Sequence, residues 1–213
     1  MTARAGIFSL SMITVCICTP LLAQDTEFVL IKKDGPIAVY ERWVTFPGSD
    51  PQVTARELKG EFTFNNTVYA GLKLIQDEKK VYKWQHHVTE FKVFTQPDTA
   101  IWHEYSYHDI PWPVSDQDHF LEYKLHIKKQ GRELFITFCT KTNDKVAPVR
   151  KGVTRMELSG SWKLEQLAAG KTKATYRIIS MPSGIPKWLT DPIIHRNIMT
   201  TIERFIKIMN EDD

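Results

Sequence analysis

The sequence predicts an α+β fold in which one curved antiparallel sheet wraps around a long C-terminal helix. Three observations lead to this prediction. Strand-like runs rich in β-branched and aromatic residues follow one another through most of the chain, each bounded by Gly, Pro, Asn or Asp. One segment between them has the spacing of a short helix. The chain then ends in a long amphipathic stretch.

The N-terminal segment has the features of a secretory signal. Arg4 precedes an almost unbroken apolar run over residues 7–22, and Ala23 follows it as a small residue before polar sequence. We therefore expect residues 1–23 to be removed on export, to the periplasm or the outside of the cell. Residues 24–213 would form one mature domain. A buried helix or an uncleaved anchor is the alternative.

The composition excludes several classes of protein. Cys16 and Cys18 would leave with the signal, and Cys139 alone cannot form an internal disulfide, so the domain must be held by its core. The formal net charge of +3 comes from basic residues dispersed among acids, which gives no case for nucleic acid. Since no apolar run after residue 23 is long enough to span a bilayer, we expect a soluble mature protein.

The strand-like segments are defined by composition and by alternation. They are Glu27–Lys32, Pro36–Val44, Val53–Phe64, Val81–Phe94, Thr99–His108, Phe120–Lys129, Leu134–Lys141, Val153–Leu167 and Thr172–Met181. The run LEYKLHIKK shows the alternation of a sheet with one buried face: Leu121, Tyr123, Leu125 and Ile127 point one way and their neighbours the other.

Two segments have helical spacing. Residues 66–77 are predicted to form a short helix, because Val68, Leu72 and Ile75 recur at spacings of four and three. The second helix is predicted from Pro186 to Asn210, with a short separate turn or a kink before Pro192. Its apolar stripe is Ile194, Ile198, Ile202, Phe205 and Met209. A helix of this length, roughly 37 Å, can lie across a whole sheet.

Four strings of the mature chain, in order and spacing, resemble the START family of lipid-transfer domains. They are DGPIAVYERWV, LIQDEKKVYKW, PWPVSDQDHF and SGIPKWL, and the similarity runs from about Glu27 to the end. The resemblance implies a helix-grip fold, START- or Bet v 1-like. It also implies that the last helix closes over a hydrophobic tunnel, which shields one sterol, phospholipid or other apolar molecule.

The resemblance also assigns individual residues. Asp118 matches an aspartate common in the family, while Gln117 stands where an arginine is usual. Glu104 falls where several sterol-binding members carry an acid in the cavity, and Tyr123 falls where those members carry the arginine that pairs with it. The chain therefore keeps the acid and lacks its cation. Arg155 matches a basic residue frequent in the family and is the candidate replacement.

The orientation of the strand around Glu104 has two solutions. Either Trp102, Glu104 and Ser106 point inward, or Ile101, His103, Tyr105 and Tyr107 do. Apolarity favours the second solution and the family alignment favours the first, which we adopt. A buried carboxylate without a partner is costly, so an inward Glu104 must be protonated, paired or bonded to a ligand hydroxyl.

These observations predict an exported, non-enzymatic domain that binds, and by extension transfers, a single lipid or sterol-like molecule. The predicted tunnel residues are Trp102, Glu104, Leu121, Tyr123, Leu125 and Arg155 in the wall, with Ile194, Ile198, Ile202 and Phe205 as the cover. Access requires the last helix or the loop Lys141–Lys151 to move. We expect a monomer without metal or cofactor, which contacts membranes transiently.

Two other classes of function stay open. The same architecture hosts enzymes such as aromatic cyclases and small hydrolases. The candidate catalytic residues are His86, His87, His103, His108, His119 and Glu104. The pairs His103/His108 and His86/His87 are expected to diverge, so neither predicts a metal site, and no G-x-S-x-G motif occurs. Cys139 is read as a small core residue.

The third class is a structural module without a ligand, whose concavity is filled by its own aromatic side chains. Trp84 and Trp162 are expected in the core under either reading. Trp188 opens the last helix and is either an anchor that docks this helix or an apolar tip for a lid or a membrane.

Overall fold

A computed structural model describes residues 25–112, 114–181 and 187–211. The predicted signal at residues 1–23 and the predicted helix start at Pro186 lie outside them. Ten strands of the described chain form one curved sheet, in the order β1-β2-β3-β10-β9-β7-β6-β5-β4, with β8 beside β6. All pairings are antiparallel except that of β8 with β6. The predicted fold class is confirmed.

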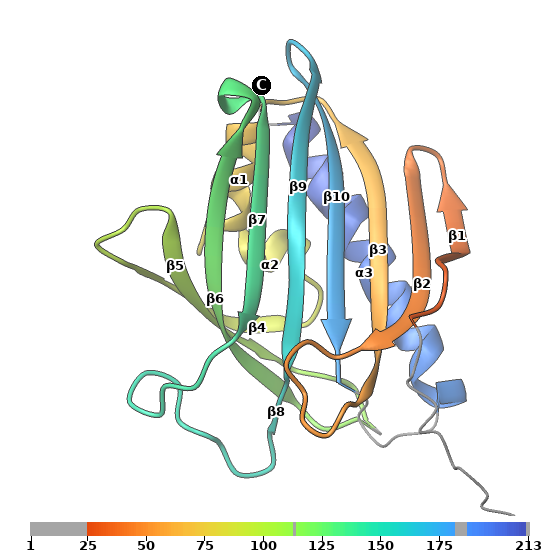
Figure 1. Cartoon of the computed structure of the whole chain (residues 1–213), viewed down its shortest axis with the longest axis vertical. Coiled ribbons are helices and arrows are strands. Elements are labelled where there is room, and N and C mark those ends of the chain that lie inside the picture. Colours follow the sequence, from red (N-terminus) through yellow and green to blue (C-terminus); the bar gives the residue numbers. More distant parts are fainter. Residues whose placement is uncertain (1–24, 113, 182–186, 212–213) are drawn as a thin grey trace, which may run out of the picture.

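The bounds of the elements are as follows. The strands are β1 (Val29–Asp34), β2 (Ile37–Thr45), β3 (Thr54–Phe64), β4 (Val88–Thr95), β5 (Ile101–His108), β6 (Gln117–Lys128), β7 (Glu133–Thr140), β8 (Thr154–Arg155), β9 (Leu158–Ala168) and β10 (Lys171–Ser180). The helices are α1 (Val68–Ile75), α2 (Val81–Trp84) and α3 (Lys187–Glu211), with a 3-10 turn at Lys129–Gly131. In Figure 1, α3 crosses behind β10 and β3, while α1 and α2 lie behind β6 and β7.

Three element predictions need correction. Residues 81–84 form α2 instead of the start of a strand, because Val81 and Trp84, three apart, are both buried on one side of a helical turn. The predicted strand over residues 153–167 is two strands, since β8 leaves to pair with β6. Helix α3 runs through Pro192 as one element.

One end of the interior is filled by rings that we call the aromatic plug: Phe62, Phe64, Trp84, Trp162 and Phe205. All are buried, and Phe205 contacts the other four with ring centroids 5.2 to 5.8 Å apart. Aromatic pairs at such distances add to the stabilisation from burial alone. The plug therefore anchors the C-terminal half of α3 to the sheet. Trp84 and Trp162 are core residues, as predicted.

Gly60 on β3 lets α3 approach the sheet. A Cβ atom at this position would overlap the Ile202 side chain, which is fully buried. We expect Gly60→Ala to lower the free energy of unfolding by about 1–3 kcal/mol, because overpacking a tight interface forces side chains off their rotamers. Ile202→Val, which removes the overlapping methyl, should recover part of this loss in the same chain. Urea denaturation of the two single variants and of the double variant measures these free energies of unfolding. If the loss in the double variant equals the sum of the two single losses, Gly60 and Ile202 are not in the proposed contact.

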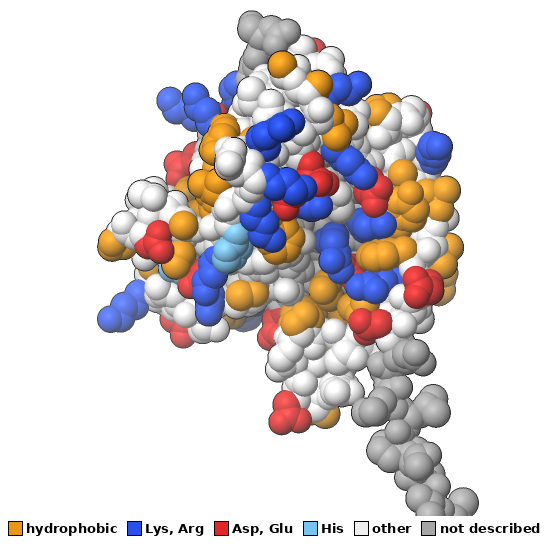
Figure 2. Space-filling model, turned by 45° about the horizontal axis from the view of Figure 1, so that its top comes forward, with side chains coloured by type: hydrophobic (Ala, Val, Ile, Leu, Met, Phe, Trp, Pro, Cys, Tyr) orange, Lys and Arg blue, Asp and Glu red, His pale blue; other side chains and the backbone are white. Residues whose placement is uncertain are grey.

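The convex face of the sheet is charged and faces solvent. Lys59 and Glu61 lie 2.9 Å apart, as do Lys163 and Glu165. Figure 2 shows such basic and acidic side chains interspersed over this side of the molecule. Pairs of this kind stabilise little in water. The concave face, which α3 covers, is therefore the side on which to look for a site.

Candidate functional site

Side chains from six strands form one line across the concave face, which we call the polar row. Its members, from β5 to β3, are Glu104, Leu121, Thr140, Leu158, Ser180 and Arg56. Since neighbours in a sheet point to the same side, all six face the interior. The row therefore carries an acid at one end and an arginine at the other.

The next row carries the aromatic wall of the site. Trp102 stacks on Tyr123 with ring centroids 5.0 Å apart, and Tyr123 lies 5.2 Å from the ring of Phe138. Trp102 and Glu104 thus point inward, in the orientation that the family alignment favoured. Leu121, Tyr123 and Leu125 lie on the same side of the sheet.

Glu104 is buried in this wall and only partly satisfied. It is 1% exposed, and its Oε1 lies 3.2 Å from Nε2 of His119, a neighbour on β6. Three buried atoms at this place have no hydrogen-bond partner in the protein: Oε2 of Glu104, Nδ1 of His119 and Nε1 of Trp102. We call these three residues the polar cluster. It offers a carboxylate acceptor and an indole donor to whatever lies next to it.

The electrostatics around the polar cluster follow from burial. Burial first, and then the Glu104 carboxylate, raise the pKa values of Tyr123 and Tyr176, so both phenols stay protonated. Burial, together with the nearby charge of His119, lowers the pKa of His108 to about 3. His108 is therefore neutral at ordinary pH, with its Nε2 atom 3.1 Å from Oγ of Ser106.

Tyr176 and His108 are enclosed by protein without being fully buried. Tyr176 and His108 are surrounded by protein closely enough for burial to shift their pKa values strongly. Both nevertheless keep some accessible surface. Tyr176 lies opposite Trp162 in the sheet and stacks on its ring, so its side chain points to the concave face. The aromatic plug thus fills one end of the concavity, and the polar row lies toward the other end.

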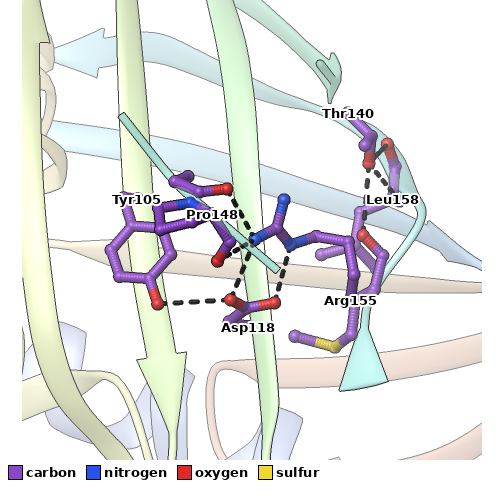
Figure 3. A network of polar contacts seen from close by, with 8 residues as sticks. Tyr105, Asp118, Thr140, Pro148, Arg155 and Leu158 are labelled. Carbon is purple, nitrogen blue, oxygen red and sulfur yellow. Dashed lines mark hydrogen bonds and ion pairs between the residues drawn. The ribbon is translucent and has the colours of Figure 1, made fainter. Parts of the chain in front are cut away.

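Arg155 does not line the concavity, which corrects the prediction. Its Nε and Nη2 atoms donate to the two carboxylate oxygens of Asp118 at 2.7 and 3.0 Å. Asp118 alternates with His119 along β6 and so points to the convex face, where the Tyr105 hydroxyl also binds it (Figure 3). Arg155 therefore pairs with Asp118 on the convex face, and the side chain that contacts Glu104 on the concave face is His119.

The loop Lys141–Lys151, which the sequence predicts as a possible gate, is held on the same convex side. Ala147 is buried beside Tyr105 and Phe120, and its carbonyl accepts from Arg155 at 3.0 Å. The remaining candidate for movement is α3. Its predicted cover residues divide into two groups. Ile198, Ile202 and Phe205 are buried in the core, whereas Ile194 is only partly buried against it.

The predictions for Cys139 and for the pair His86/His87 are wrong. Cys139 is exposed instead of buried, because Phe138 takes the inward position beside it. The rings of His86 and His87 do not diverge but lie 3.9 Å apart. Within the described ranges, no three His, Cys, Asp or Glu side chains are grouped to hold a metal ion, and no helix is long and apolar enough to cross a membrane.

Two hollows in the surface lie away from the polar cluster. One, of about 540 Å³, is lined by Lys129, Gln130, Arg132, Glu165, Gln166 and Leu167. The other, of about 220 Å³, is lined by Asn66, Ala70, Lys73, Leu74, Asp77, Lys80 and Met209. Neither includes a concave residue of the polar row, so the two hollows do not alter the choice of site.

Comparison with known proteins identifies solved structures that share this fold. No family model matches the sequence, and no curated protein matches it. A STAR-related lipid transfer protein fragment from Xanthomonas axonopodis superposes with a TM-score of 0.69 at 23% identity, over 85% of this chain and 98% of that one. Human STARD10 superposes with a TM-score of 0.70 at 15% identity, over 85% and 72% of the two chains.

The fold is that of a START domain. A more distant match is the Zhui aromatase/cyclase from Streptomyces sp. R1128, with a TM-score of 0.53 at 9% identity over 73% of this chain and 93% of that one. START-like folds typically bind hydrophobic ligands, and the matches extend to an enzyme. The particular function must therefore be argued from the residues of this START fold.

Proposed function

We propose that this START fold binds one neutral, hydroxyl-bearing apolar molecule between the polar row and α3. The observation that carries the proposal is the polar cluster, where Glu104, His119 and Trp102 each keep a buried polar atom without a partner. An unsatisfied buried polar group costs about 1–3 kcal/mol. The ligand-free protein therefore carries this cost at the polar cluster, and a ligand that hydrogen-bonds there would remove it. A ligand hydroxyl can donate to Oε2 of Glu104 and accept from Nε1 of Trp102.

The polar end of such a ligand, which would contact Glu104, is expected to determine differences in affinity more than the apolar part does. A lipid that leaves a bilayer gives up about 0.8 kcal/mol per CH₂, and an apolar chamber returns nearly the same amount. The hydrogen bonds at Glu104 then contribute the difference between ligands, about 1.5–3 kcal/mol when a charged group takes part. Selectivity is therefore expected to depend on the ligand's polar end.

The basic residues favour a neutral polar end over an anionic one. Among the described side chains, Arg56 is the buried arginine or lysine, and it already pairs with Asp191 and Glu41. Arg155 is held by Asp118 on the other face. A phosphate beside Glu104 would therefore meet a carboxylate without a compensating cation.

Export and membrane contact complete the proposal. The signal-like N-terminus supports export to the periplasm or outside the cell, where a monomer would carry its ligand between membranes. Trp112 and Trp188 are 91% and 76% exposed, and exposed tryptophans suit the interface of a bilayer. The structural match to a STAR-related lipid transfer protein from Xanthomonas axonopodis supports a lipid cargo.

The alternatives have weaker support. Catalysis would use Ser106, His108, His119 or Glu104, but a histidine with a pKa of about 3 is a poor general base at neutral pH. A module without a ligand is favoured by the aromatic plug, which fills one end of the concavity. The unpartnered atoms at the other end favour a binding site.

Extraction tests the proposal. Organic solvent should release one equivalent of a neutral apolar alcohol from protein purified from its native source, and mass spectrometry would identify it. Recovery of nothing, or of a phospholipid, would overturn the proposal. As a defined probe, cholesterol should bind better than its 3-methyl ether, which lacks the donor.

The variant Glu104→Gln isolates the polar end. It keeps the shape but replaces the carboxylate acceptor, so cholesterol should bind about tenfold more weakly, as expected for losing one charged hydrogen bond. The matched control is Glu122→Gln on the convex face of β6, which should change nothing. Fluorescence titration of both variants measures this difference; equal affinities would exclude Glu104 as the contact.

A further inference from the structure

The polar row is polar at its two ends and apolar between them. At the β5 end, Glu104 keeps a buried carboxylate oxygen without a partner. In the middle, Leu121 and Leu158 are buried and apolar. The Thr140 hydroxyl between them is already occupied, because it accepts from the Leu158 N–H at 2.7 Å and donates to the Leu158 carbonyl at 3.2 Å. Unoccupied polar groups are next expected at the β3 end of the row, which is Arg56.

Arg56 is a buried donor that the protein uses only in part. It is 6% exposed, its Nη2 atom donates to Asp191 of α3, and its Nε atom lies 3.6 Å from the Glu41 carboxylate. Its Nη1 atom is also buried but has no hydrogen-bond partner within the described part of the chain. A guanidinium does not lose its proton in proteins, so Nη1 stays a donor that needs an acceptor.

The surroundings of Arg56 select a neutral acceptor. Its positive charge already faces two carboxylates, those of Asp191 and Glu41. Even if His195 is protonated beside Glu41, the two positive charges only balance the two negative ones. An anion at Nη1 would therefore meet uncompensated repulsion from the carboxylates. A hydroxyl, carbonyl or ether oxygen accepts a hydrogen bond without adding charge.

The distance between the two ends sets the length of a ligand that reaches both. Strands β6, β7, β9 and β10 lie between β5, which carries Glu104, and β3, which carries Arg56. Since neighbouring strands are about 4.8 Å apart, the two backbones are about 24 Å apart along the sheet. The sheet is curved and both side chains extend inward, so the polar groups themselves are closer, roughly 10–20 Å apart. A long apolar body spans this distance.

We propose that the ligand has two polar ends: an elongated neutral molecule with one hydroxyl at Glu104 and a second neutral oxygen at Nη1 of Arg56. This inference rests on the proposed ligand site and adds the chemistry of the far end. A molecule with a single hydroxyl leaves the Arg56 donor unpartnered. The polar row thus selects for the spacing between two oxygen atoms as well as for the apolar body between them.

Straight-chain alcohols test the second contact in the wild-type protein. Hexadecanediol, with a hydroxyl at each end, should bind about tenfold more tightly than hexadecanol, as expected for one hydrogen bond to a charged donor. Octanediol should show no such advantage over octanol, because its hydroxyls are too close together to reach both ends. Displacement of the fluorescent probe diphenylhexatriene measures the four affinities. A second hydroxyl buried without a partner would lower affinity, so equal or weaker binding of hexadecanediol overturns the inference.

The variant Arg56→Lys assigns this preference to Arg56. Lysine keeps a positive charge beside Asp191 and Glu41 but lacks the planar fork that carries Nη1. The preference for hexadecanediol over hexadecanol should fall below about threefold. The matched control is Arg177→Lys on the convex face, where the guanidinium pairs with Glu57, and it should keep the full preference. An unchanged preference in Arg56→Lys overturns the assignment. If this variant does not fold, the wild-type series still decides.

The contact at Arg56 and the contact at Glu104 fail in different ways. If Glu104→Gln leaves the affinity for hexadecanol unchanged, the proposed contact at Glu104 is wrong. If Glu104→Gln weakens hexadecanol binding but hexadecanediol binds no better than hexadecanol to the wild type, the Glu104 contact stands and the Arg56 contact is refuted.

Discussion

Phe205→Ala is expected to lower the free energy of unfolding by about 3–5 kcal/mol, the range for large aromatic truncations in a packed core. Phe205 is fully buried and is the ring of the plug that α3 contributes. Its removal leaves a cavity against Phe62, Phe64, Trp84 and Trp162 and removes four ring contacts. Urea or thermal denaturation measures the loss.

The neighbouring residue Lys207 provides the control for this prediction. It lies on the exposed side of the same helix, so Lys207→Ala should change the free energy of unfolding by less than about 0.5 kcal/mol. A loss for Phe205→Ala as small as the control's would mean that the plug does not anchor α3.

The features that the sequence predicts well are those set by local periodicity. The stripe from Ile198 to Met209 follows the helical repeat, and all its members are buried. The alternation from Leu121 to Leu125 correctly gives the concave face of β6. The same alternation places His119 inward. The family pattern does not give it as the partner of Glu104, because that pattern points to a cation further along the chain.

The features that it misses depend on distant contacts. Arg155 is two residues into a strand that pairs in parallel with β6, and that pairing decides which carboxylate it meets. Neither composition nor spacing contains this information. The contact between His195 and Glu41 is similar, since the two residues are 154 positions apart in the chain. Cys139 is a different case, where alternation with Phe138 gives the exposed side but apolar neighbours suggested burial.

Arg155→Met is expected to be among the most destabilising changes on the surface of this fold, at about 3–5 kcal/mol, because it leaves a buried carboxylate without its cation. Asp118 is 1% exposed, and Arg155 supplies two of its hydrogen bonds. The same guanidinium holds the carbonyls of Ala147 and Pro148, so the loop over the convex face should loosen as well (Figure 3).

A second substitution separates the lost charge pair from lost packing. Asp118→Asn in the Arg155→Met chain removes the buried charge, so the double variant should be more stable than Arg155→Met alone. Urea denaturation of the wild type and of the two variants would show this difference. If Arg155→Met left the free energy of unfolding unchanged, the ion pair with Asp118 would not stabilise the fold. If it weakened ligand binding instead, Arg155 would belong to the ligand site.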